Sequence, residues 1–292
     1  MRNKKYIICL VFVTLFLNVY SQQDTTRLQP GDSLITGDVD ATTHQEVYKL
    51  NLAVDIPIVA VGGGWSAFAF TKIYKKDPST PEQIMNLDKN DINSFDRGSA
   101  GNWDEEADKI SDYPFYASMP LPFFLLFDKE IRHDAGKIGL LYLEALAITG
   151  MIYTGCVYFV DRYRPQTYNT SIPVEDRTGG NYKDAFIAGH PALVATATFF
   201  TAKVYSDYNP DSKFKYALYG LAVGATGYTV YLRHIAGKHF PSDFILGVST
   251  GILSGMLVPH FHKNKMHKDS RLGFMPVSNG KMHGFALRYS LK

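Results

Sequence analysis

The sequence predicts an all-α protein: a helical bundle with about five transmembrane or deeply buried helices, followed by a short C-terminal β-hairpin. Two observations lead to this prediction. Five long apolar runs carry at most one charge each, and they lack the polar face that a helix on a soluble surface keeps. Near the C-terminus, Asn279-Gly280 separates two short runs, which is typical of a hairpin turn. The apolar runs cover residues 56–71, 138–160, 191–205, 216–232 and 244–258.

The N-terminus has the pattern of a secretory signal. Residues 1–5 are basic and residues 6–17 are apolar, so a signal peptide over residues 1–21 with cleavage after Ser21 is expected. An uncleaved anchor helix is the alternative. Residues 22–48 are polar and predict a flexible lead-in. The helical domain is then expected over residues 49–262.

Composition limits the chemistry. Cys9 lies within the signal, so Cys156 is left as the single cysteine of the mature chain, which excludes an internal disulfide or a thiolate metal cluster. The formal net charge is +2 and becomes about −1 once the basic residues of the signal are removed. That charge gives no electrostatic reason to expect nucleic acid as a partner. No segment indicates a particular protein partner.

The remaining segments fix the expected topology. Residues 77–112 are polar and predict a solvated loop with short helices. Tyr113–Phe127 is apolar but contains three prolines, which favours an interfacial segment over a straight span. Five spans after a cleaved signal place residues 161–190 and 233–243 on the exported side. The basic flank and hairpin of residues 263–292 then begin inside, as the positive-inside rule prefers.

Two features inside the apolar runs call for an interpretation. Gly62–Gly64 lacks the lysine of a phosphate-binding loop and indicates close helix packing. Glu144 is the only charge of its run, and pairing within the bundle is favoured over a functional role. His260, His262 and His267 are interpreted as part of a basic juxtamembrane flank and not as metal ligands.

The chemistry is concentrated in one stretch. Arg233 lies six positions before His239, and Asp243 lies four positions after it. Because Pro241 suits the first turn of a helix, His239 is expected at the helix start, where Asp243 can orient its ring. The helix N-terminus and Arg233 both attract an anion. The spacing therefore predicts a phosphate site with a nucleophilic histidine.

This pattern of Arg, five residues, His, three residues, Asp resembles the third signature of the type 2 phosphatidic acid phosphatase superfamily. That superfamily also contains bacterial acid phosphatases and vanadium haloperoxidases. The resemblance covers about residues 138–258 and implies a membrane-associated helical phosphatase.

The two upstream signatures of the family are present with departures. The first, Lys, six residues, Arg-Pro, retains Arg164-Pro165, but Val157 stands at the lysine position. The second, Pro-Ser-Gly-His, retains Gly189-His190, but Ala188 stands at the serine position. Loss of one such donor typically costs about 3 to 4 kcal/mol of transition-state stabilisation if nothing replaces it. Arg162 and Lys238 are two candidates to replace the missing lysine charge.

The resemblance implies a role for each side chain that matches a signature. His239 attacks phosphorus and forms a phosphohistidine, while Asp243 holds its tautomer. His190 protonates the leaving oxygen and then activates water. The groups expected to bind the phosphate are Arg164, Arg233 and the Gly189 N–H. No metal or other cofactor is implied.

The function expected is that of a phosphoric monoester or diphosphate hydrolase acting on a lipid-linked phosphate or pyrophosphate, of the undecaprenyl, phosphatidate or lipid A type. The expected location is the bacterial cell envelope, at the inner membrane with the site facing the periplasm. Two alternatives stay open: a soluble periplasmic acid phosphatase, and a catalytically weakened homologue that binds phosphorylated lipid. A haloperoxidase is disfavoured because the lysine is missing.

Overall fold

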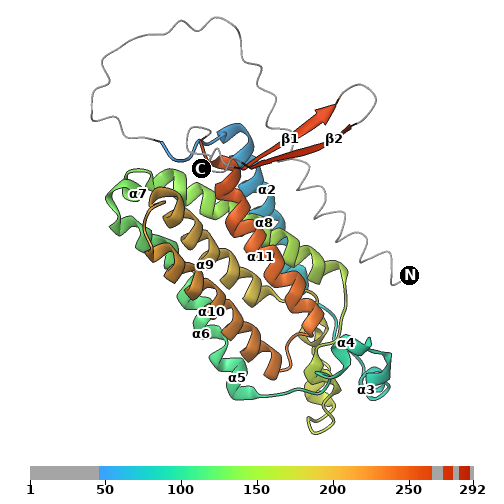
Figure 1. Ribbon diagram of the computed structural model, residues 1–292. Coiled ribbons are helices and arrows are strands. Elements are labelled where there is room, and N and C mark those ends of the chain that lie inside the picture. Colours follow the sequence, from blue (N-terminus) through green and yellow to red (C-terminus); the bar gives the residue numbers. More distant parts are fainter. Residues whose placement is uncertain (1–45, 265–271, 279–282, 290–292) are drawn as a thin grey trace, which may run out of the picture.

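The computed structural model describes residues 46–264 and the backbone of two strands near the C-terminus. Five long helices of the described chain form a bundle (Figure 1). They are α2 (Leu52–Ile73), α8 (Ala135–Phe159), α9 (Gly189–Tyr208), α10 (Phe214–Ile235) and α11 (Pro241–His262). Short helices lie between α2 and α8: α3 (Pro81–Met85), α4 (Ser94–Arg97), α5 (Glu105–Ile110), α6 (Asp112–Ser118), η3 (Leu121–Phe127) and α7 (Lys129–His133). The predicted helical architecture is confirmed. The expected signal peptide lies outside the described residues.

Helix α9 lies at the centre of the bundle, where it contacts α8, α10 and α11. Helix α11 packs against α9 through small residues. Gly247, Gly251 and Gly255 recur every four positions on α11 and face the backbone of α9. A Cβ atom at Gly251 would stand 2.0 Å from the carbonyl oxygen of Ala192. The two helices can therefore approach closely only because this ridge has no side chains.

Helix α2 lies parallel to α8, and this direction changes the expected topology. Gly62 faces Ala147 so closely that a Cβ would stand 3.0 Å from its carbonyl oxygen, which confirms the packing role predicted for the first glycine of the triplet. Further along both helices, Ile73 packs with Val157. Since both helices run toward the same end of the bundle, the chain between them must return along its length.

That return runs through α5, α6, η3 and α7 (Figure 1). At one end of this path Asp108 contacts Arg233 in the last turn of α10, and at the other end Asn209 donates to Asp128 at 3.0 Å. The chain thus passes the length of the bundle once more than the sequence predicts. The count of five alternating passages, which put the signatures on the exported side after a cleaved signal, is therefore wrong.

The end of the bundle opposite to the signatures is closed by both ends of the helical domain. Tyr48 is fully buried, pairs with Lys263 as a β-bridge and donates from its hydroxyl to Asp207 at 2.8 Å. The predicted flexible lead-in is therefore wrong for its last residues. His262, interpreted as part of a basic flank, is instead buried inside this end.

Glu144 is fully buried at the same end. Its Oε2 lies 3.8 Å from Nε2 of His262, and that nitrogen lies 3.1 Å from Oδ1 of Asp55. The prediction that Glu144 pairs within the bundle is confirmed.

Among the described residues, α2, α8 and α11 are long and apolar enough to cross a membrane. The apolar segment after α5 is broken into α6 and η3, as its prolines predict. It exposes several large aromatic side chains: Tyr113, Tyr116, Phe123, Phe124 and Phe127. An exposed aromatic surface of this kind suits a lipid interface.

Two strands follow the bundle. β1 (Leu272–Ser278) and β2 (His283–Tyr289) pair antiparallel, with Leu272 opposite Tyr289 and Ser278 opposite His283. They occupy the segment in which the sequence predicts a hairpin.

Candidate active site

The residues of the three signatures meet at one end of the bundle, because four helix ends meet there. Arg164 follows α8, His190 opens α9, Arg233 lies in the last turn of α10, and His239 precedes α11. The turn before His239 depends on Gly237, whose φ is +66°. A Cβ there would also stand 1.8 Å from the carbonyl oxygen of Asn102, so the loop before α5 covers this turn directly.

His239 is buried and has a fixed orientation. Its Nδ1 donates to the carbonyl oxygen of Ala185 at 2.7 Å, which leaves the lone pair on Nε2. Burial, followed by the charges of Arg233 and Arg164, lowers the pKa of His239 well below its usual value. The imidazole is therefore neutral at pH 7, as a nucleophile requires.

Asp243 is close to His239 in the chain but does not bond to it. One carboxylate oxygen of Asp243 accepts from the Phe240 N–H at 2.8 Å, and the other pairs with Arg162. Within the described residues the predicted orienting contact is thus made by the Ala185 carbonyl instead. Asp243 fixes the first turn of α11 and therefore acts on His239 through the backbone.

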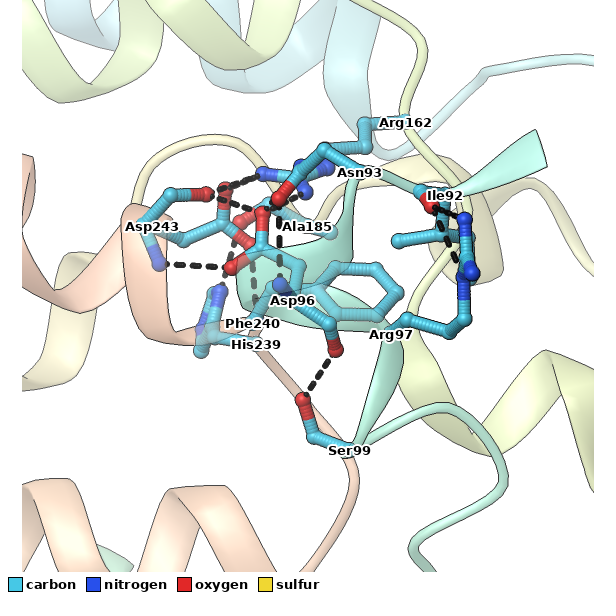
Figure 2. A network of polar contacts seen from close by, with 11 residues as sticks. Ile92, Asn93, Asp96, Arg97, Ser99, Arg162, Ala185, His239, Phe240 and Asp243 are labelled. Atoms are coloured by element: carbon cyan, nitrogen blue, oxygen red, sulfur yellow. Dashed lines mark hydrogen bonds and ion pairs between the residues drawn. The ribbon is translucent and has the colours of Figure 1, made fainter. Parts of the chain in front are cut away.

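Arg162 belongs to a buried polar network with Asp96 and Asp243 (Figure 2). It pairs with Asp96 at 2.7 Å and with Asp243, and its guanidinium lies 4.5 Å from the centre of the Phe240 ring. Ser242 donates to Asp96 from both its N–H, at 2.9 Å, and its hydroxyl, at 2.6 Å. Asp96 comes from α4, in a polar segment without any pattern that predicts this contact.

Three cations gather beside His239. Arg233 and Lys238 are buried and share the carboxylate of Asp108, at 3.0 and 2.5 Å. The charge of Arg164 acts on both of them. Burial, followed by that charge, lowers the pKa of Lys238 to about 8. Such a cluster of buried like charges favours an anion among them.

Two atoms of this cluster are orphan donors. Nε of Arg164 and Nε of Arg233 are buried and have no hydrogen-bond partner within the part of the chain that the structure describes. Buried guanidinium donors are normally satisfied, and phosphate oxygens match their geometry. The two candidates to replace the missing lysine lie in different places. Lys238 lies in the cation cluster, whereas Arg162 lies in the polar network.

His190 faces the same cluster. Burial lowers its pKa to about 3, and the charges of Arg233, Arg164 and Lys238 add to this effect. Its Nε2 lies 3.3 Å from Oδ1 of Asp112 at the start of α6. The two histidines and the three cations therefore share one electrostatic environment.

The departures from the family signatures are filled by apolar packing. Val157 is fully buried against α2. Lys76, which belongs to no motif, donates to the Val157 carbonyl at 2.7 Å and pairs with Asp161 and Asp184. Ala188 is fully buried and accepts the close approach of Gly247.

Gly189 is required for packing, because a Cβ there would stand 2.5 Å from the ring of Tyr153. The glycine at this position thus allows α9 to begin directly against α8.

A group of side chains that could hold a metal ion lies elsewhere. Ligand atoms of Asp55, Glu144 and His262 lie within 4.8 Å of one another at the opposite end of the bundle. This group is separate from the chemistry of the signature residues.

A neutral buried histidine, a second histidine and a cluster of buried cations thus lie together at one end of a helical bundle with candidate membrane spans. Residues 138–267 match the model of the PAP2 superfamily. The matched segment is less than half of the chain, and over those residues it confirms the resemblance drawn from the three signatures.

The chain is also similar to a lipid A 4'-phosphatase of Porphyromonas gingivalis, with 23% identity over 145 residues. The matched region is 48% of this chain and 57% of that relative, so the chain spans little more than half of the relative's length. No solved structure matches the chain.

Proposed function

We propose that the protein is a metal-independent phosphatase that hydrolyses a lipid-linked phosphate or pyrophosphate through a phosphohistidine. The observation that carries the proposal is the neutral His239, with its tautomer fixed by Ala185, beside buried cations with orphan donors. The superfamily match supports a phosphatase, and the three apolar helices support a lipid substrate.

The first step uses the lone pair on Nε2 of His239. This atom attacks phosphorus, a P–N bond forms, and the P–O bond to the leaving group breaks. Arg164, Arg233 and Lys238 are placed to bind the equatorial oxygens, on which negative charge spreads. Because three fixed cations offset that negative charge, no metal ion is required.

His190 is assigned the proton transfers. A phosphate monoester brings a charge of about −1.5 to −2 at pH 7, which offsets the cations that lower the pKa of His190. His190 can then give a proton to the leaving oxygen. In the second step it takes a proton from water, which attacks phosphorus and breaks the P–N bond to free His239.

Asp243 has a positioning role in this proposal. Its carboxylate holds the Phe240 N–H and Arg162, and so it fixes the helix turn that carries His239. The role expected from the family resemblance, a direct hydrogen bond to the ring, is not part of the proposal.

The substrate class rests on the relative, whose name specifies lipid A. A lipid A type phosphate is therefore the first substrate to test, beside undecaprenyl pyrophosphate and phosphatidate. The proposed location is the inner membrane, with the site on the periplasmic side. Under this orientation the end of the bundle that carries Tyr48 and Lys263 faces the cytoplasm. A cleaved signal would place residue 22 on the periplasmic side, whereas this orientation places the start of α2 on the cytoplasmic side. A cleaved signal and a membrane-spanning α2 are therefore not compatible in this proposal.

A weakened homologue that binds phosphorylated lipid remains the second candidate, since Val157 and Ala188 are packed as apolar residues. The soluble acid phosphatase has less support because three described helices are candidate spans.

The test is phosphate release by the purified protein in detergent with EDTA, from the three lipid classes and p-nitrophenyl phosphate. His239→Ala should abolish turnover and the acid-labile phosphoprotein label, whereas His260→Ala, at the opposite end of α11, should retain both. Turnover that persists in His239→Ala refutes the mechanism. A folded wild type that binds lipid phosphate without turnover favours the second candidate.

A further inference from the structure

An acidic corner formed by α5 and α6 lies over the cation cluster and outside the segment that matches the family. Asp108 on α5 places one carboxylate oxygen 3.0 Å from Arg233 and the other 2.5 Å from Nζ of Lys238. Asp112 on α6 lies 3.3 Å from His190. Each of these acids thus contacts a group to which the proposed function assigns the phosphate or the leaving oxygen.

The Asp108 carboxylate has the chemistry of a phosphate surrogate. It is an anion whose two oxygens accept from an arginine and a lysine at once, as two phosphate oxygens do. Ser111 adds a contact of 3.1 Å to the same Arg233 nitrogen. The carboxylate and a phosphate cannot occupy the same donors of Arg233 and Lys238 at the same time, so they compete for these donors.

The corner also has the position of a removable cover. The side chain of Asp108 is 27% exposed, whereas those of Arg233 and Lys238 are only 7% and 11% exposed, so the acid lies on the solvent side of the cations. Helix α5 has six residues. It packs on the end of α10 through one small apolar cluster, which consists of Ala107, Ile110, Leu232, Ile235 and Ala236. A helix of fewer than two turns with so small an apolar contact can leave this position at low cost.

We propose that Asp108 is a resident competitor for the phosphate group: its carboxylate occupies donor positions on Arg233 and Lys238, and α5 moves away when phosphate binds. Asp108 thereby sets the affinity of the site for anions. The inference rests on the proposed phosphate site, but it does not require turnover.

The test measures phosphate binding rather than catalysis. Inorganic phosphate is titrated by calorimetry into the full chain in detergent, as wild type and as Asp108→Asn, which keeps the shape and removes the charge. Asp108→Asn should bind phosphate about tenfold more tightly. Glu105→Gln is the matched control, because it removes the same charge from α5 at an exposed position that pairs with Lys109. It should bind as wild type does.

Movement of α5 has its own reporter. Trp103 precedes α5, and its ring lies 5.7 Å from Nζ of Lys238. The only other tryptophan is Trp65. In a Trp65→Phe background, phosphate should therefore change the emission of Trp103, and Asp108→Asn should show part of this change without phosphate.

The outcomes separate the inference from the proposed function. Equal or weaker phosphate binding by folded Asp108→Asn, and also by Asp108→Ser, means that the acid holds the cations in place, and the inference fails. If the variants behave in this way and the wild type hydrolyses lipid phosphate, the proposed function stands and only the inference about Asp108 fails. If Asp108→Asn binds phosphate more tightly but the protein hydrolyses no substrate, the inference about Asp108 stands and the proposed phosphatase function fails. Absence of phosphate binding in wild type and variants overturns both.

Discussion

Arg162→Met and Lys238→Met should produce different defects: the first should lower folding stability, and the second should lower turnover. Both are candidates for the cation that Val157 does not supply, but their surroundings differ. Arg162 pairs with two fully buried carboxylates, those of Asp96 and Asp243. Lys238 lies in the cation cluster and shares Asp108 with Arg233.

The expected magnitudes follow from these contacts. Arg162→Met leaves two buried carboxylates without their cation, which costs about 3 to 5 kcal/mol of folding stability. For a chain of this size the unfolding temperature should fall by roughly 6 to 20 °C. Lys238→Met removes one cation from the developing phosphate charge, and its turnover should fall about 100-fold, which corresponds to about 2.7 kcal/mol.

The assay pairs thermal unfolding with turnover of a phosphate ester in one detergent. Lys109→Met, which removes an exposed cation from α5, is the control for a nonspecific charge effect. An Arg162→Met variant that keeps its unfolding temperature and loses turnover, beside an active Lys238→Met variant, would refute the assignment and place Arg162 on the phosphate.

Three further predictions test the electrostatics, the packing and the path of the chain. kcat/KM should fall above pH 8, because Lys238, with its pKa lowered to about 8, loses the required charge there; Lys238→Arg should extend activity to higher pH, and an unchanged profile would contradict this. Gly251→Ala should destabilise the protein by about 1 to 3 kcal/mol in thermal unfolding. Gly63→Ala, which meets nothing within 4 Å, should not, and equal effects would refute the ridge argument. Cysteines introduced at Lys75 and Glu46 should react with an impermeant maleimide from opposite sides of the membrane; labelling from one side would exclude α2 as a span.

The residues of the candidate site could be predicted because their order and spacing are local properties of the chain. His239 and Arg233 belong to one signature, and His190 and Arg164 belong to the two before it. Helix ends then bring them together without further information. The predicted contact of Asp243 with the ring is wrong, since spacing along a helix start permits such a hydrogen bond but cannot show that the Ala185 carbonyl takes its place.

The acids around the site could not be predicted. Asp96, Asp108 and Asp112 lie in a polar segment with no periodicity, and the basic side chains that they contact, Arg162, Arg233 and His190, are 66 or more residues away. Lys76 reaches Val157 in the same way, over 81 residues. Contacts of this kind depend on the direction in which the segment crosses the bundle.

The sequence by itself determined the five long helices and the residues that make up the candidate site, because hydropathy and motif spacing act over short stretches of chain. The tertiary structure decided the parallel packing of α2 on α8, the return of the chain through α5 to α7, and the acids that this return brings to the cations. Hydropathy records how apolar a run is but not which way it points. A close contact such as Gly62 on Ala147 fixes that direction. The side of the bundle to which Asp108 is delivered follows from it.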